Sequence, residues 1–276
     1  MRFLTNLQRI DRRIMYILLA IVVWIPLRWD IIHQPLPVTP EVRGAYKAVE
    51  DVPKGKIVFI SIWWSAGTLA ENRPQTEAVA RHLFMLGKPF AIIPWDQQGT
   101  TLSYNTVKAV ADEMHKEYGK DWMAFGYQPV FDQTLQGMAV SIPGTLKKDK
   151  NGTPLSDIPM MKNIRTARDI GLVFDVTPSQ TLPSWINFIG QPYKVPLIYG
   201  PTGVMVPEGY NYLDSKQIKG MLPGLIGATK YEQLIHQRGF ATRAANALST
   251  SHGLIILLIV LGNIGYFLSR RQQESR

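Results

Sequence analysis

The protein has no cysteine in its 276 residues. This absence excludes disulfide frameworks, thiolate zinc sites, iron–sulfur clusters and cysteine nucleophiles. Charged residues are also few, at 18%, whereas 46% of the residues are hydrophobic and 10% are aromatic. Such a composition excludes an intrinsically disordered chain, and the length is sufficient for one substantial globular domain.

The sequence also lacks the short motifs that mark several classes of enzyme. There is no Gly-x-Ser-x-Gly nucleophile elbow and no Gly-x-x-x-x-Gly-Lys phosphate loop. Residues 65–68, Ser-Ala-Gly-Thr, offer backbone N–H groups to an anion but lack the glycine pattern of a dinucleotide site. No two histidines have the spacing of metal ligands, and no nucleophile stands beside a base. We therefore predict no metal, no cofactor and no catalytic residue.

The formal net charge of +9 is concentrated at the two ends of the chain. Residues 1–30 contain five arginines and two aspartates, and residues 270–276 contain three arginines and one glutamate. More than half of the excess therefore lies beside the two most apolar segments, and the rest is spread over a long middle region. This distribution indicates a membrane rather than a nucleic acid as the partner.

The first apolar segment, residues 14–27, has no charged residue but is short for a membrane span. Extension to residue 32 reaches the usual length of about 20 residues, with Arg28 placed to snorkel toward the interface. A cleaved signal peptide is the alternative, because Arg12 and Arg13 precede a short apolar stretch. The following residues offer no small-residue cleavage site, so we predict an uncleaved transmembrane helix over residues 14–32.

The second apolar segment, residues 244–269, contains no Asp, Glu, Lys or Arg. A core helix is rarely apolar on every face, so we predict a second transmembrane helix here. Because arginines flank the outer ends of both segments, residues 1–13 and 270–276 are predicted to be cytoplasmic. Residues 33–240 then form a periplasmic or extracellular domain, and the lack of cysteine favours a bacterial inner membrane.

The middle region alternates strand and helix signals. Nearly continuous apolar stretches predict five strands, over residues 56–64, 89–95, 122–127, 171–176 and 195–200. Helical patterns lie between them, and a last helix is predicted over about residues 215–235. Such strands with helical crossovers are typical of a doubly wound, mostly parallel α/β sheet, flavodoxin-like or Rossmann-like. We expect the flavodoxin-like strand order 2-1-3-4-5.

Doubly wound sheets bind ligands at the carboxyl ends of their strands. At these positions the sequence places an aromatic-rich set with two carboxylates: Trp63, Trp64, Ser65, Trp95, Asp96, Tyr127, Asp175 and Tyr199. One interpretation is a pocket for a flat or sugar-like ligand. The alternative is that the rings pack under loops or against another subunit and that the aspartates cap helices. An acid–base pair of Asp96 and Asp175 would need the two carboxylates within about 10 Å of each other.

Glycines mark two further segments. Gly220, Gly224 and Gly227 are predicted to share one face of the last soluble helix, where each glycine costs about 1 kcal/mol and so indicates close backbone packing. That packing is against the domain's own sheet or against a neighbouring protomer, and we favour the neighbour for part of the face. The second apolar segment has small and polar residues suited to helix–helix contact in lipid. These residues are Gly262, Asn263 and Gly265.

Four stretches of the sequence carry a family resemblance. They are LPVTPEVRGAYKAVE (36–50), GTPLSDIPMMKNIR (152–165), QIKGMLPGLIGATKYE (217–232) and LIILLIVLGNIGYFL (254–268). Together they resemble a family of uncharacterised bacterial membrane proteins with a short N-terminal anchor, an extracytoplasmic α/β domain and a C-terminal span. The resemblance implies this topology and a bacterial origin, and it implies no catalytic residue.

These observations favour a non-enzymatic subunit of a bacterial envelope complex. Its α/β domain would be an interaction module, with other membrane subunits or a second copy of the chain as the partner. A membrane-anchored ligand-binding or sensing module is the alternative, and a hydrolase or transferase is the third interpretation.

Overall fold

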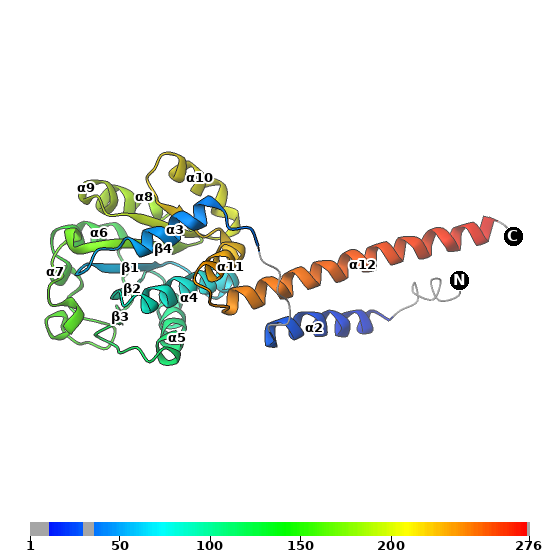
Figure 1. The fold of residues 1–276 in the computed structure, drawn as a ribbon, viewed down its shortest axis with the longest axis horizontal. Helices are drawn as coiled ribbons and strands as arrows, with labels where there is room; N and C mark the ends of the chain where they lie inside the picture. Colours follow the sequence, from blue (N-terminus) through cyan, green and yellow to red (C-terminus); the bar gives the residue numbers. More distant parts are fainter. Residues whose placement is uncertain (1–10, 30–35, 275–276) are drawn as a thin grey trace. The chain divides into compact units, whose positions relative to one another are not determined.

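The computed structural model describes residues 11–29 and 36–274, which belong to two compact units. One unit is an α/β domain formed by Leu36–Ala241, and the other is formed by the two ends of the chain. Figure 1 shows the mixed helices and strands of the first unit and the helices of the second.

The domain is built on a six-stranded sheet in which all neighbouring strands are parallel. The strands are β1 (Ile57–Ile62), β2 (Phe90–Pro94), β3 (Trp122–Ala124), β4 (Ile170–Thr177), β5 (Leu197–Pro201) and β6 (Gly220–Met221). The α/β class, the mostly parallel sheet and the five predicted strands are confirmed, and a sixth strand is added.

The strand order is β3-β2-β1-β4-β5-β6, so the flavodoxin-like order predicted from the sequence is wrong. β1 lies between β2 and β4. The chain winds outward from β1 to β3, returns across the sheet, and winds outward again from β4 to β6, which is the Rossmann order. The deciding step is the connection over residues 125–169, because no local pattern specifies on which side of β1 it ends.

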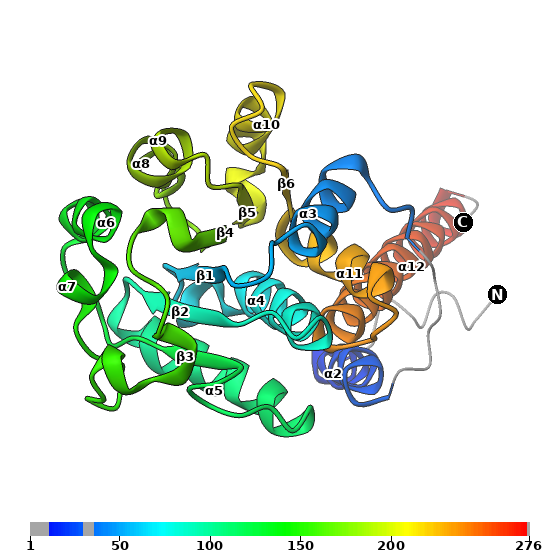
Figure 2. The same ribbon diagram turned by 60° about the vertical axis from the view of Figure 1, so that its left-hand side comes forward.

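Helices cover both faces of the sheet, as strands that are apolar on both sides require. On one face lie α3 (Pro40–Glu50), α4 (Leu69–Met85), α5 (Gln97–Glu113) and α11 (Gly224–Leu234). On the other lie α6 (Phe131–Val140), α7 (Ile142–Leu146), α8 (Leu182–Trp185), α9 (Gln191–Tyr193) and α10 (Val206–Asp214), as Figure 2 shows. In β1, Val58 and Ile60 pack on the first face and Ile57 and Phe59 on the second, because side chains alternate along a strand.

The segment predicted as a last helix over residues 215–235 is a short strand followed by a helix, so the predicted helix is confirmed over Gly224–Leu234 and wrong before it. Gly220 belongs to β6, where a Cβ atom would overlap the backbone of α3. Gly224 begins α11 with a left-handed φ of 51°, and a Cβ atom at Gly227 would press on the residues just before the helix. The three glycines therefore do not share a helix face. Gly220 and Gly227 allow close packing inside the domain.

The second unit contains α2 (Arg12–Arg28) and most of α12 (Phe240–Glu274). The hydroxyl group of Thr250 in α12 donates a hydrogen bond to the carbonyl oxygen of Val22 in α2 at 3.3 Å. The two helices of this unit are therefore in contact at that point.

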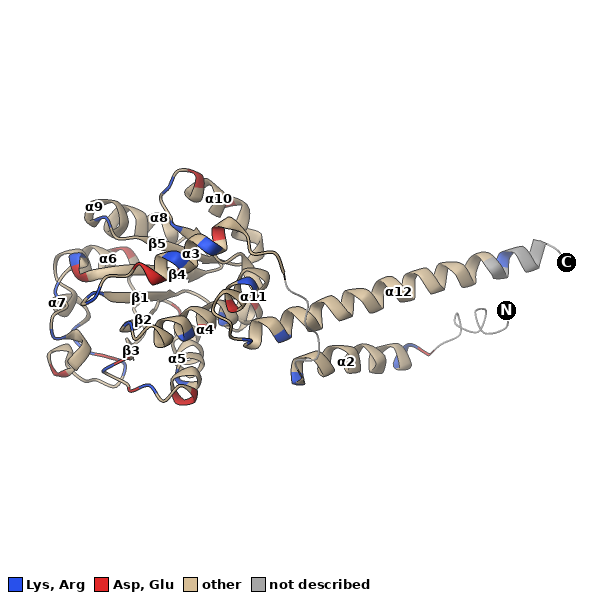
Figure 3. Cartoon of the chain, viewed as in Figure 1, with Lys and Arg blue, Asp and Glu red and all other residues tan. Residues whose placement is uncertain are grey.

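Within the described part of the chain, one helical segment, Phe240–Phe267, is long and apolar enough to cross a membrane. It overlaps the predicted second span, residues 244–269, and no charged residue lies between Arg243 and Arg270 (Figure 3). Two such helices were expected. α2 has 17 residues and includes Pro26, and the last three residues of the predicted first span, 30–32, lie outside the described residues.

Candidate functional site

The eight residues predicted at the strand ends lie near the carboxyl edge of the sheet, but they face different ways. Trp95, Asp175 and Tyr199 are buried on the face covered by α6 to α10. Trp64 is buried on the opposite face, where its indole N–H donates to the hydroxyl group of Thr76. The remaining four have more contact with solvent, and they are Trp63, Ser65, Asp96 and Tyr127.

Asp175 is the centre of a buried polar group, the carboxyl-edge cluster, formed with Ser61, Trp95, Thr181 and Trp185. The Ser61 and Thr181 hydroxyl groups donate to the two carboxylate oxygens of Asp175, each at 2.7 Å. The Ser61 oxygen also accepts the indole N–H groups of Trp95 and Trp185, each at 3.0 Å. Complete burial raises the pKa of Asp175 from its usual 3.8 to about 6, and the hydrogen bonds oppose that rise.

Phe131, the first residue of α6, packs over the carboxyl-edge cluster. Its ring centroid lies 4.6 Å from that of Trp95, 5.2 Å from that of Trp63 and 6.3 Å from that of Trp185. All three pairs have the edge-to-face geometry that aromatic rings favour. These aromatic residues pack within the domain, and a ligand at this edge stays a prediction.

The two predicted carboxylates have separate roles. Asp96 is the N-cap of α5, where its Oδ1 accepts a hydrogen bond from the backbone N–H of Gly99 at 2.7 Å. Asp175 is held by hydroxyl groups inside the carboxyl-edge cluster. Asp96 therefore caps a helix, as the alternative to a ligand pocket had predicted.

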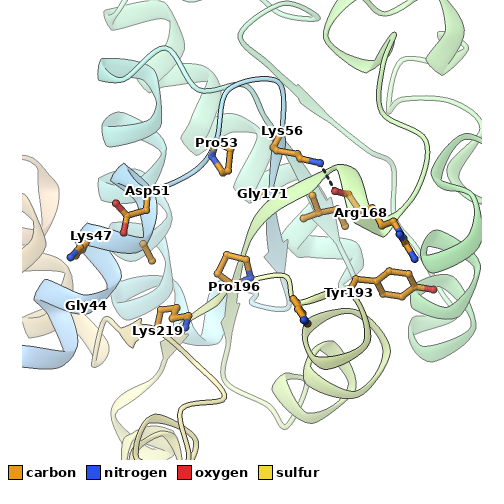
Figure 4. A pocket seen from close by; sticks show the side chains of 13 residues that line it. Gly44, Lys47, Asp51, Pro53, Lys56, Arg168, Gly171, Tyr193, Pro196 and Lys219 are labelled. Atoms are coloured by element: carbon orange, nitrogen blue, oxygen red, sulfur yellow. Dashed lines mark hydrogen bonds between the residues drawn. The ribbon is translucent and has the colours of Figure 1, made fainter.

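A cavity of about 520 Å³ lies at the opposite, amino edge of the sheet (Figure 4). Four of its basic residues come shortly before four strands. Lys56 precedes β1, Arg168 precedes β4, Lys194 precedes β5 and Lys219 precedes β6. Because parallel strands start at the same edge, these residues meet although they are far apart in the sequence. We call this site the amino-edge cavity.

The lining of the amino-edge cavity is strongly basic. Helix α3 adds Lys47, and Asp51 follows at the end of that helix, so the lining has five basic residues and one acidic residue. Lys56 is satisfied, since its Nζ donates to the carbonyl oxygen of Arg168 at 2.6 Å and lies 3.9 Å from a carboxylate oxygen of Asp169. The other four basic residues are exposed and form no ion pair with another described residue. Their charge is therefore available to a ligand.

Apolar groups form the rest of the cavity lining. The cavity is lined by Ala48, Pro53, Ile170 and Pro196, and the ring of Tyr193 stands at one side (Figure 4). A lining of apolar groups with a few polar groups is typical of sites for small molecules. The amino-edge cavity is thus suited to a ligand that combines negative charge with some apolar surface.

Sequence reasoning missed this site because it considered only the residues that follow the strands. The available signal is a basic residue shortly before each of four apolar strands, at Lys56, Arg168, Lys194 and Lys219. A second signal is Gly44 in α3, where a Cβ atom would overlap the backbone of Lys219. That close approach brings α3 against the start of β6 and places Lys47 at the cavity.

No cluster of three or more His, Cys, Asp or Glu side chains in the described part of the chain is arranged to hold a metal ion. No protein-family model, curated protein or solved structure matches the chain. The resemblance to bacterial membrane proteins therefore stays a prediction. The fold and the cavity define a Rossmann-ordered α/β domain with a basic cavity at its amino edge, and among the described residues one helical segment is also long and apolar enough to span a membrane.

Proposed function

We propose that this protein is a membrane-anchored binding module whose α/β domain takes an anionic ligand into the amino-edge cavity. The observation that supports this function is the charge of the cavity, with five basic residues and one acidic residue in its lining. Like charges around a concave surface reinforce one another and raise the local concentration of counter-ions. The volume of 520 Å³ lies in the range of small-molecule sites.

The lining favours binding over catalysis. None of the described residues around the amino-edge cavity is His, Ser or Thr, so the usual pairing of a nucleophile with a base is missing there. Asp51 is the single carboxylate of the lining and is exposed. The carboxylate with the raised pKa, Asp175, is buried in the carboxyl-edge cluster at the other end of the strands.

In this proposal α12 crosses the membrane and α2 is an additional anchor. The uncharged stretch between Arg243 and Arg270 supports the span, and the arginines at the outer ends of both apolar segments support cytoplasmic termini. The α/β domain then lies on the periplasmic or extracellular side of a bacterial inner membrane. Cysteine accessibility in intact cells tests this topology with a maleimide that cannot cross the membrane. A single cysteine introduced at exposed Lys162 should be labelled, and one introduced at Ser275 should be protected.

The binding function is tested with the full-length protein in an uncharged detergent. Calorimetry would measure the affinity for pyrophosphate and for citrate, together with that of Lys194→Ala and Lys219→Ala. Each substitution should weaken binding about three- to tenfold, because each removes one charged contact. Lys162→Ala is the matched control, since Lys162 is an exposed lysine outside the cavity lining.

If Lys194→Ala and Lys219→Ala bind the anions with the same affinity as the control Lys162→Ala, binding is a general effect of surface charge. No measurable affinity of the wild-type protein for either anion, or for a broader set of phosphorylated and carboxylated metabolites, would refute the proposed function.

Assembly into an envelope complex is a second candidate function. Apart from Gly262 itself, its chain neighbours and the nearby backbone of α12, no described atom lies within 4 Å of the position that a Cβ atom at Gly262 would take. Asn263 is exposed beside it, whereas Gly265 is buried. Small residues with a polar neighbour on an open helix surface favour helix–helix contact in lipid. Gly262→Leu should then reduce the oligomer observed by native mass measurement after gentle extraction. A wild-type protein that is monomeric and free of partners would contradict this candidate.

A further inference from the structure

Two smaller hollows adjoin the amino-edge cavity and share lining residues with it. A hollow of about 290 Å³ shares Lys194, Pro196 and Lys219 with the cavity. Another of about 220 Å³ shares Arg168, Lys194 and Tyr193 with it. Lys194 lines all three spaces, so they lie side by side at the amino edge of the sheet, and we call them together the basic groove.

The basic groove extends the positive charge beyond the cavity. Its 290 Å³ section is lined by Lys194, Lys216 and Lys219 and by no acidic residue. Lys194 and Lys216 follow α9 and α10, and both have left-handed φ angles, of 55° and 61°. Each lysine therefore stands at a sharp turn of the chain just before a strand begins. Lys216 is exposed and forms no ion pair with another described residue.

Six basic residues and one acidic residue line the groove as a whole. The basic residues are Lys47, Lys56, Arg168, Lys194, Lys216 and Lys219. A single phosphate group is compact and satisfies only the donors that converge on it. Figure 4 shows instead that Lys47 and Arg168 lie on opposite sides of the cavity. One compact anion therefore leaves part of this charge without a counter-ion.

Resting on the proposed function, we infer that the ligand carries several phosphate-type groups in series. One end occupies the amino-edge cavity, and the chain of anionic groups continues over Lys194 and Lys219 to Lys216. The three lysines of the smaller section contact successive anionic groups, while the apolar lining of the cavity accommodates the uncharged portion of the ligand. Lys216 is the residue that separates this inference from the proposed function, because it lines the smaller section and not the cavity.

The experiment uses full-length protein in uncharged detergent and linear phosphates of increasing length: orthophosphate, pyrophosphate and a longer polyphosphate. Affinity should rise with chain length, and its salt dependence should become steeper with each additional contact. Lys216→Ala should weaken binding of the longer polyphosphate about three- to tenfold and leave the affinity for pyrophosphate unchanged. Lys194→Ala should weaken both, and Lys162→Ala should weaken neither.

The outcomes separate the two proposals. If pyrophosphate binding requires Lys194 but polyphosphate binds no more tightly, the extended ligand is refuted and the proposed function stands. If Lys216→Ala and Lys162→Ala reduce polyphosphate affinity equally, the extended ligand is also refuted. If no phosphate binds at all, the extended ligand is refuted, and the proposed function is then decided by citrate and the carboxylated metabolites.

Phosphate groups in series occur in soluble ligands and at the surface of anionic phospholipids. A parallel arm therefore measures whether phosphatidylglycerol added to the detergent micelles competes with polyphosphate for the protein, against added phosphatidylcholine alone. Competition that Lys216→Ala weakens identifies lipid headgroups as the source. An absence of competition identifies a soluble ligand.

Discussion

The two edges of one parallel sheet have opposite character in this protein. At the carboxyl edge, the polar atoms of the carboxyl-edge cluster are buried and hydrogen-bonded, and the rings of Trp63, Trp95 and Trp185 pack around Phe131. At the amino edge, basic side chains surround an open cavity. Doubly wound sheets ordinarily bind ligands at the carboxyl edge. The difference teaches that strand order alone does not locate a site, because the side chains that pack over each edge decide which one is open.

The largest expected effect is a loss of folding stability for a substitution at the carboxyl edge that is absent for one at the amino edge. Trp185→Ala should reduce the free energy of unfolding by roughly 3–5 kcal/mol, because it removes a buried ring from the carboxyl-edge cluster and leaves a cavity. Lys219→Ala at the amino edge should change it by no more than about 0.5 kcal/mol, since its side chain is exposed. Urea unfolding followed by far-UV circular dichroism measures both. Similar losses for the two variants would show that the amino edge is structural.

The second prediction uses the pKa of Asp175, which is about 6 in the folded protein and 3.8 ordinarily. Between these values the unfolded chain releases a proton that the folded protein retains, so the stability contributed by protonated Asp175 is lost as the pH rises from 4 to 6. The asparagine of the Asp175→Asn variant cannot ionise, and its side-chain carbonyl oxygen can still accept the hydrogen bond from the Ser61 hydroxyl group. Its free energy of unfolding relative to wild type should therefore rise by up to about 3 kcal/mol over this range.

The comparison with wild type is needed because a second buried group titrates in the same range. Burial lowers the pKa of His82 to about 4, so its contribution to stability is lost as the pH falls from 6.5 to 4, opposite in sign to that of Asp175. Both proteins contain His82, and the difference between their unfolding curves cancels it. A difference that is constant from pH 4 to 7 would contradict the raised pKa.

A third prediction concerns the contact that builds the amino edge. Gly220→Val should cost roughly 1–3 kcal/mol or more, because its side chain would force β6 away from α3 beside the cavity. Gly262→Val, in an open part of α12, is the matched control and should leave the unfolding of the α/β domain unchanged. Thermal unfolding of the full-length protein in detergent measures both. If Gly220→Val unfolds normally but fails to assemble, the glycine serves a neighbouring protomer as first expected.

The smallest expected effect tests the like charges of the amino edge. Exposed lysines that lack ion pairs repel one another, and salt screens this repulsion. Raising the salt concentration should therefore stabilise the wild-type protein by a few tenths of a kcal/mol more than a Lys194→Ala and Lys219→Ala double variant. Melting temperatures in sodium chloride, with Lys162→Ala as the control, make the comparison. An equal salt effect in all proteins would show that the four exposed cations are too far apart to interact.

Local patterns in the sequence determined the elements of this protein. Five apolar stretches predicted five strands, and the uncharged run before Arg270 predicted the long apolar helix. The helix-capping role of Asp96 was among the interpretations because an N-cap requires only a residue type next to a helix start. The exception is the Gly220–Gly227 segment, where helical spacing misled because Gly220 packs against α3, more than a hundred residues earlier in the chain.

Only the tertiary structure decided which distant residues meet. Ser61 and Asp175 are 114 residues apart in the sequence, and their side chains are hydrogen-bonded because β4 pairs with β1. The same return brings the residues before β1, β4, β5 and β6 to one edge and so creates the basic groove. Strand order is a long-range choice, made by burial across the whole sheet, and short-range periodicity carries no record of it. The sequence therefore determined the strands, and the tertiary structure decided which of their side chains meet at each edge of the sheet.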